Sequence, residues 1–179
     1  MQPIFYFPST IVGVDDHPDS LFMLNTVFSS LYSIKTFQNP QEAINFLEKY
    51  KSPLASTHFL REITEGENAG LPEYSQVDFN ILNITQLSDL ANKQNEISVI
   101  IIDLNMPGIN GLELCKQFKD KPFKKILLTG EKTYREALKA FNDQIIDCFI
   151  QKDSPTLDDE LKNAAIELTH QYFCEKSQA

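Results

Sequence analysis

The chain has 179 residues, of which 42% are hydrophobic and 23% are charged, and its formal net charge is −9. This composition suits one soluble globular domain with a sizeable core. An acidic surface repels the phosphate backbone of nucleic acids, so we expect no direct nucleic-acid partner. No apolar run is long enough to span a bilayer, so we expect no membrane partner.

The cysteines and the absence of familiar enzyme motifs narrow the function further. Cys115, Cys148 and Cys174 are odd in number and far apart, and they form neither a zinc pattern nor a disulfide framework. This usage favours a reducing compartment, so we expect a cytoplasmic location. The N-terminus lacks the basic region and the cleavage site of a signal peptide. The sequence contains no Walker-type loop, no HExxH and no GxSxG.

Short apolar runs alternate with helical patterns along most of the chain. We expect strands over residues 10–14, 32–37, 98–103, 124–130 and 145–150. We expect helices over residues 18–31, 40–47, 112–118, 134–141 and 157–173. This alternation predicts an α/β fold with a parallel sheet and right-handed crossovers. We expect a five-stranded doubly wound sheet of flavodoxin-like order 2-1-3-4-5, covered on both faces as a three-layer sandwich.

Residues 51–97 depart from this alternation. Connections between a helix and a strand normally take a few residues, so one of about 40 residues is uncommon. We interpret the stretch as an insertion between the second helix and the third strand, with a helical candidate over residues 84–91; a disordered linker is the alternative. Apolar residues such as Phe59 and Phe79 indicate that part of it packs. We expect one domain over residues 1–179, with an N-terminal arm over 1–9 and a closing helix over 156–174.

Acidic residues follow two of the predicted strands. The first strand ends in Asp15 and Asp16, and the third ends in Asp103. In a doubly wound sheet these strands are neighbours, so their carboxyl ends share one crevice. Three carboxylates in one crevice repel one another, so the site is costly unless a cation is present, and Mg²⁺ suits such oxygen ligands. The fourth and fifth strands end in Thr129 and Lys152. The alternative for each aspartate is a cap on the following helix.

Four strand-end motifs, in this order, resemble the receiver domain of two-component response regulators, a family of bacterial signalling proteins. They are Val14-Asp15-Asp16, Asp103-Leu104-Asn105-Met106-Pro107-Gly108-Ile109-Asn110-Gly111, Thr129-Gly130 and Lys152. The resemblance covers residues 10 to about 170, apart from the insertion. It implies a phosphorelay module whose partner is a histidine kinase or a phosphotransfer protein.

The resemblance assigns the phosphoacceptor and the metal ligands. Asp103 would accept a phosphoryl group from a phosphohistidine. Asp16, Asp103 and the backbone carbonyl of Asn105 would bind Mg²⁺ directly. Asp15 would act through a metal-bound water. We interpret His17, beside the acids, as a loop residue and not as a ligand.

The resemblance also implies a switch. Lys152 would pair with Asp103 and then with a phosphoryl oxygen, and Thr129 would hydrogen-bond the phosphoryl group. Phe149 would be the aromatic switch residue, with a plain core residue as the alternative. In the family, the surface of the fourth helix, the fifth strand and the closing helix commonly forms a homodimer, which we expect here.

Two positions depart from the family pattern, and two other functions compete with the phosphoacceptor. Asp153 stands where the family usually has proline, and Gly130 leaves a phosphoryl group open to water. A pseudo-receiver would keep the fold only as a constitutive interaction module. A phosphohydrolase with an aspartyl phosphate would need a second acid at the position of Asn105. We therefore expect a signalling phosphoacceptor and not an enzyme.

Overall fold

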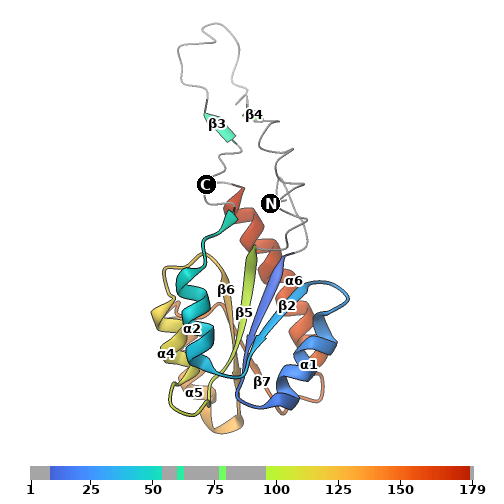
Figure 1. Ribbon diagram of the computed structural model, residues 1–179, viewed down its shortest axis with the longest axis vertical. Coiled ribbons are helices and arrows are strands. Elements are labelled where there is room, and N and C mark those ends of the chain that lie inside the picture. The colour runs from blue at the N-terminus through green and yellow to red at the C-terminus, as the bar shows by residue number, and fades with distance from the viewer. Residues whose placement is uncertain (1–8, 54–59, 63–76, 80–95, 178–179) are drawn as a thin grey trace, which may run out of the picture.

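The computed structural model describes residues 9–53, 60–62, 77–79 and 96–177. Its main sheet has five strands, all parallel, in the order β2-β1-β5-β6-β7 (Figure 1). In that order the strands are Ser33–Phe37, Thr10–Val14, Ile97–Asp103, Lys124–Thr129 and Cys148–Gln151. The predicted flavodoxin-like order 2-1-3-4-5 is confirmed, because β5, β6 and β7 are the third, fourth and fifth strands of this sheet.

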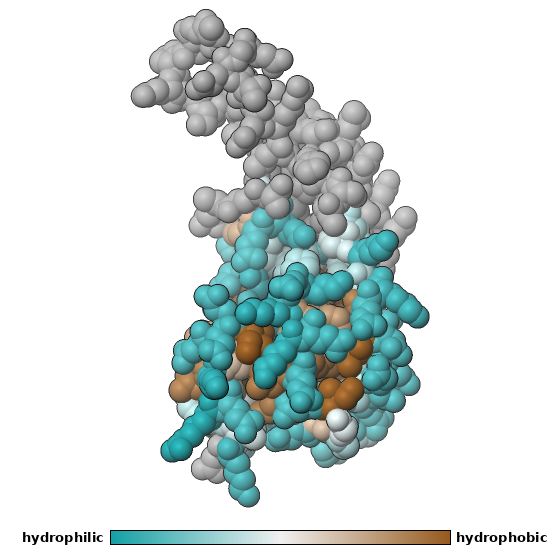
Figure 2. Space-filling model, turned by 90° about the vertical axis from the view of Figure 1, so that its left-hand side faces the viewer, coloured by the Kyte–Doolittle hydropathy of each residue, from teal (hydrophilic) through white to brown (hydrophobic). Residues whose placement is uncertain are grey.

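Helices cover both faces of the sheet and make the predicted three layers (Figure 1). They are α1 (Pro18–Phe28), α2 (Pro40–Lys49), α4 (Gly111–Gln117), α5 (Tyr134–Asn142) and α6 (Leu157–Lys176). Buried side chains of α1 and α6 form one core cluster with the sheet, and those of α2, α4 and α5 form the other. Figure 2, which views the side that carries α2 and α4, shows apolar surface between polar side chains there.

The central strand β5 explains the unbroken apolar run in the sequence. All seven of its residues are buried. Ile100 and Ile102 belong to the core beneath α2, α4 and α5, whereas Val99 and Ile101 belong to the core beneath α1 and α6. Because successive side chains point to opposite faces, a strand covered on both faces carries apolar residues toward both, as Val99 to Ile102 do.

Side-chain caps begin two of the helices. Asn39 accepts a hydrogen bond from the backbone N–H of Gln41 at 2.9 Å, and Pro40 occupies the first turn of α2. Asn110 accepts one from the N–H of Leu112 at 2.8 Å at the start of α4. Both caps satisfy amides that have no partner inside the helix. The predicted start of the second helix is therefore confirmed.

The predicted C-terminal end of the first helix and the predicted start of the fifth strand were wrong. Helix α1 ends at Phe28, whose carbonyl accepts from the N–H of Leu31 at 2.9 Å, and the Leu31 side chain is half exposed. Strand β7 begins only at Cys148. Gln144 has a φ of 55°, and the N–H of Ile145 donates to the carbonyl of Ala140 at 2.9 Å. This left-handed helix end keeps Ile145 in the core but outside the strand.

Part of the expected insertion contains a second, separate sheet. Strands β3 (Leu60–Glu62) and β4 (Val77–Phe79) pair antiparallel. Ile97 belongs to β5, so the insertion ends before it. The helical candidate over 84–91, Phe59 and residues 1–8 of the expected arm lie outside the described residues.

Within the part of the chain that the structure describes, no helix combines the length and the apolar character needed to cross a membrane.

Candidate functional site

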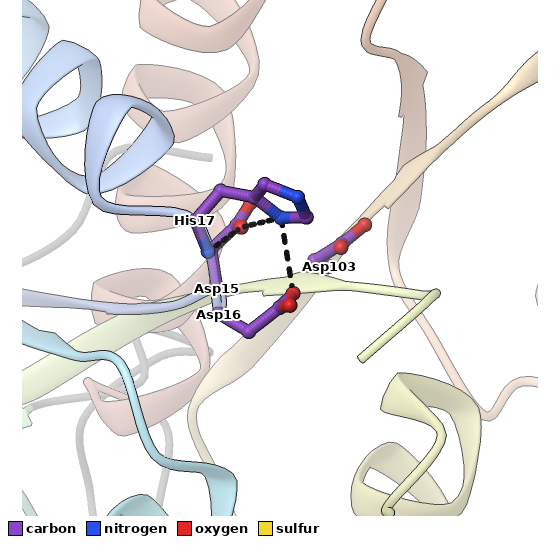
Figure 3. A group of neighbouring side chains, drawn as sticks. All are labelled: Asp15, Asp16, His17 and Asp103. Carbon is purple, nitrogen blue, oxygen red and sulfur yellow. Dashed lines mark hydrogen bonds and ion pairs between the residues drawn. The ribbon is translucent and has the colours of Figure 1, made fainter. Parts of the chain in front are cut away.

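The acidic residues predicted from strands one and three lie together at the carboxyl edge of the sheet. Asp15 and Asp16 follow β1, Asp103 ends β5, and these strands pair so that Val14 lies beside Ile102. One ligand atom from each of Asp15, Asp16, His17 and Asp103 lies within 4.8 Å of the others (Figure 3). The pairing of two parallel strands therefore creates the shared crevice that the sequence predicts.

Lys152 joins the two buried acids. Its Nζ lies 2.7 Å from Oδ2 of Asp15 and 3.0 Å from Oδ1 of Asp103. The Asp15 side chain is fully buried, and that of Asp103 is 5% exposed. The backbone N–H of Lys152 donates to the carbonyl of Thr129 at 2.8 Å, which fixes this loop to the end of β6. The structure thus brings Lys152 to Asp103, as the resemblance implies, and also to Asp15.

The loop after β1 is held by its own hydrogen bonds. Oδ1 of Asp15 accepts from the backbone N–H of His17 at 2.9 Å, and the N–H of Asp15 donates to the carbonyl of Phe37 at 3.2 Å. Gln38 donates through Nε2 to the carbonyl of Asp16 at 3.2 Å. These contacts hold the Asp15 carboxylate and the backbone of Asp15 and Asp16.

His17 is the residue whose position the sequence did not predict. Its Nδ1 lies 3.2 Å from Oδ1 of Asp16 and 3.5 Å from Oδ1 of Asp15, as Figure 3 shows. The side chain is 68% exposed, so core packing does not hold it there. The sequence signal for this contact was the position of His17 directly after Asp15 and Asp16. A sequence alone does not show which way the imidazole ring points.

Thr129 ends β6, next to the strand that ends in Asp103. Its side chain is fully buried, and among the described residues its Oγ1 is the buried polar side-chain atom without a hydrogen-bond partner. A buried hydroxyl without a partner costs free energy, so this donor is available to an incoming acceptor. A Cβ added at the following Gly130 would meet nothing within 4 Å, so the chain is open on that side of the glycine.

The remaining predicted residues lie further along the same loops and strands. Asn105 is exposed, two residues beyond Asp103. Phe149 is half-buried on β7, with its ring centroid 5.3 Å from that of Tyr134 and 6.1 Å from that of Phe141, both edge to face. The Lys152–Asp153 peptide bond is trans, and Asp153 is exposed.

The comparisons with known proteins agree with this fold. The sequence profile described as the response regulator receiver domain matches residues 70–165. The structure of the Legionella pneumophila response regulator LqsR has a TM-score of 0.72 and 30% identity, over 98% of this chain and 48% of that one. This chain therefore spans about half the length of that relative. No curated protein matches the sequence.

Two further solved structures share the fold across nearly their whole length. A response regulator receiver domain protein from Clostridium thermocellum has a TM-score of 0.61 and 15% identity, over 91% of this chain and 95% of that one. The signal receiver domain of an HD domain-containing protein from Pseudomonas fluorescens Pf-5 has a TM-score of 0.63 and 17% identity, over 98% and 97%.

The parallel sheet, the acids at its carboxyl edge and the profile match together identify a receiver domain of two-component signalling. The profile covers more than half of the chain, and this protein belongs to the response regulator receiver domain family.

Proposed function

We propose that this domain is a phosphoacceptor that takes a phosphoryl group onto Asp103 from a histidine kinase or a phosphotransfer protein. The observation that carries the proposal is the position of Lys152, whose Nζ lies 3.0 Å from Asp103 and 2.7 Å from Asp15. An ammonium beside a carboxylate offsets its negative charge, and it can later neutralise a phosphoryl oxygen. We place this exchange in the cytoplasm, where the three free cysteines would stay reduced.

The residues around Asp103 suit phosphoryl transfer because that reaction depends on positioning and on charge neutralisation. A carboxylate oxygen of Asp103 would form a bond to phosphorus. The phosphorus–nitrogen bond of the donor phosphohistidine would break, and the imidazole would leave with the electron pair. Lys152 and the hydroxyl of Thr129 would then donate to phosphoryl oxygens. The buried and unpartnered Thr129 hydroxyl supports this role.

The donor set also suits Mg²⁺. Three carboxylates meet at the crevice, and the single ammonium of Lys152 cannot balance their charge. Asp16, Asp103 and the carbonyl of Asn105 would hold the ion directly, and Asp15 would act through a water. Magnesium prefers oxygen ligands and keeps several waters. When bound, it supplies positive charge next to the phosphoryl oxygens.

Intact-mass measurement with acetyl phosphate and Mg²⁺ tests the proposal. We expect the mass to rise by one phosphoryl group in the wild type and not in Asp103→Asn. The exposed Asp120→Asn variant is the matched control and should behave as the wild type. A wild type that gains no mass would favour the pseudo-receiver. Turnover of a phosphate ester would favour a phosphohydrolase, although Asn105 stands where that class needs an acid.

The output of the switch would be a change in self-association. Tyr134, Leu138 and Phe141 are 42%, 40% and 45% exposed on α5. Inward movement of the Thr129 hydroxyl toward a phosphoryl group would leave space for Phe149, and the surface of α5, β7 and α6 would change with it. We expect Thr129→Ala to be phosphorylated but to lose the change in sedimentation that phosphorylation causes in the wild type. Equal changes in the two proteins would refute this coupling.

A further inference from the structure

We propose that His17 is a nitrogen ligand of the metal site, so that this receiver domain prefers ions that accept an imidazole over Mg²⁺. The inference rests on the proposed function because that function places the metal at this site. It does not require that Asp103 is phosphorylated. It assigns a specificity role to a residue that the sequence indicates only as part of a loop.

The distances around Nδ1 of His17 fit the edges of a coordination shell. In an octahedral site with metal–ligand distances of about 2.1 Å, neighbouring ligand atoms are about 3 Å apart. Nδ1 of His17 lies 3.2 Å from Oδ1 of Asp16 and 3.5 Å from Oδ1 of Asp15. One atom from Asp103 lies within 4.8 Å of all of them, so the four side chains converge on one place.

Lys152 does not occupy the Asp15 oxygen that lies nearest to the His17 ring. Its Nζ contacts Oδ2 of Asp15, so Oδ1 of that residue faces His17. On Asp103 it contacts Oδ1, which leaves Oδ2 for another partner. The ammonium and the imidazole therefore contact different oxygens of Asp15.

The contacts of the His17 ring are with the two acids, and the shortest is a hydrogen bond between its Nδ1 and Oδ1 of Asp16 at 3.2 Å. His17 is the N-cap residue of α1, yet its side chain makes no capping hydrogen bond. A serine, aspartate or asparagine would cap this helix better. The side chain is 68% exposed and so does not pack in the core. The backbone N–H of His17 donates to Oδ1 of Asp15, and the ring lies beside the same acids (Figure 3).

An imidazole nitrogen among the ligands would raise the affinity of the site for some ions more than for others. Carboxylate and carbonyl oxygens suit Mg²⁺, whereas an imidazole suits Ni²⁺ and Zn²⁺, and affinity rises from Mn²⁺ to Ni²⁺ at a mixed site. His17 would therefore strengthen the binding of Ni²⁺ far more than that of Mg²⁺. Mn²⁺ would occupy the same site with the nitrogen directly bonded.

Calorimetry with Mg²⁺ and with Ni²⁺ on the untagged chain tests the selectivity. We expect His17→Ala to weaken Ni²⁺ binding by about tenfold and to change Mg²⁺ binding by less than about twofold. His170→Ala on α6 is the matched control for binding to a histidine elsewhere, and it should leave both affinities unchanged. Equal effects of His17→Ala on the two ions, or no effect on Ni²⁺, would overturn the inference.

Electron spin-echo modulation of bound Mn²⁺ gives a second readout that needs no activity. We expect a directly coordinated ¹⁴N signal in the wild type that is absent in His17→Ala. A wild type without the signal, or a variant that keeps it, would overturn the inference. Phosphorylation of Asp103 in Mg²⁺ is measured separately by mass, so a chain that fails there but keeps the nitrogen signal refutes the proposed function alone.

Discussion

Gly111 lies against the backbone of the proposed phosphoacceptor. Its N–H donates to the carbonyl of Leu104 at 3.0 Å, and this bond closes the loop between β5 and α4. A Cβ at this position would lie 2.0 Å from the backbone oxygen of Asp103, which cannot move aside as a flexible side chain can. Only a glycine allows this approach, so the residue fixes where Asp103 sits.

We expect Gly111→Ala to destabilise the fold by about 1–3 kcal/mol, because overpacking against backbone forces the loop outward. It should also reduce labelling of Asp103 by acetyl phosphate, since the carboxylate moves away from Lys152. Urea unfolding and intact mass measure the two effects. Gly130→Ala is the control: it adds a methyl group where nothing lies within 4 Å, at an ordinary φ of −89°. A Gly111→Ala protein as stable as this control would contradict the argument.

The residue types of the site were predictable from the sequence, whereas their contacts were only partly so. Acids at the ends of two buried strands meet because parallel strands align their carboxyl ends. The additional bond from Lys152 to Asp15 and the direction of the His17 ring depend on side-chain torsions, which the order of residues does not encode. The buried Thr129 hydroxyl was indicated only through the family resemblance.

Lys125 is a buried cation beneath α4 and α5. It is 5% exposed, and its Nζ donates to the carbonyl of Phe123 at 3.3 Å. Burial lowers the pKa of Lys125, although the nearby Asp147 acts in the opposite direction. Burial also raises the pKa of the neighbouring Cys115 thiol to about 12. The amine is therefore a cost to the folded state at neutral pH.

We expect Lys125→Met to stabilise the protein by about 1 kcal/mol or more at neutral pH, because it removes a buried charge. In the wild type the native state loses this proton before the unfolded state does. The contribution of Lys125 to stability therefore rises as the pH approaches the ordinary lysine pKa of about 10.5, and the advantage of the variant should shrink. Urea unfolding between about pH 7 and about pH 10 measures the difference.

Lys124→Met is the matched control for the same change on the other face of β6. Lys124 lies 2.6 Å from Glu175 and 3.6 Å from Asp147, so its loss removes ion pairs and should not stabilise the protein. Equal stabilisation by the two substitutions would show that burial of the Lys125 charge is not the cause.

At the scale of elements, a buried carboxylate joins three parts of the chain at the amino edge of the sheet. Glu96, which is 2% exposed, precedes β5 and accepts from Oγ of Ser52 at 2.8 Å and from the hydroxyl of Tyr172 on α6. Tyr50, after α2, accepts from the N–H of Ile97 at 3.0 Å. Burial, and then the charge of Glu96, raises the pKa values of both tyrosines, which stay protonated donors.

We expect Tyr172→Phe to lower the free energy of unfolding by about 1–3 kcal/mol, because a buried carboxylate loses a donor while the ring volume is kept. Urea unfolding at neutral pH measures this loss. Tyr134→Phe removes the hydroxyl of a tyrosine that is 42% exposed, and it should have little effect. If the two variants lose equal stability, the contact of Tyr172 with Glu96 contributes no more than a surface hydroxyl.

The accuracy of the predicted elements followed the strength of their local signals. Strand β5 and the start of α2 carry an unbroken apolar run and a capping Asn-Pro pair, and both were predicted correctly. Ile145 and Ile146 are apolar because they pack in the core, but a left-handed residue before them keeps them out of β7. An apolar residue in the sequence therefore indicates burial more directly than it indicates a strand or helix.

At the scale of the molecule, the two polar centres lie at opposite edges of one sheet. The acidic site is at the carboxyl ends of β1 and β5, and the Glu96 contacts are at the amino end of β5. Figure 1 shows β3 and β4 beyond this amino edge, away from the end that carries Asp103. The insertion therefore leaves and re-enters the domain far from the proposed phosphorylation site.

Replacement of residues 54–95 by a short Gly/Ser linker should leave the domain folded. The two ends of the insertion are already held together, because Oγ of Ser52 lies 2.8 Å from Oε1 of Glu96. Closing a shorter loop costs less chain entropy, so we expect the free energy of unfolding to stay the same or to rise by about 1 kcal/mol. A linker of twice the length is the control and should differ by about 0.6 kcal/mol.

Labelling of Asp103 by acetyl phosphate should match the wild type, while the choice of partner should change. An unfolded product would show instead that the replaced residues complete the core.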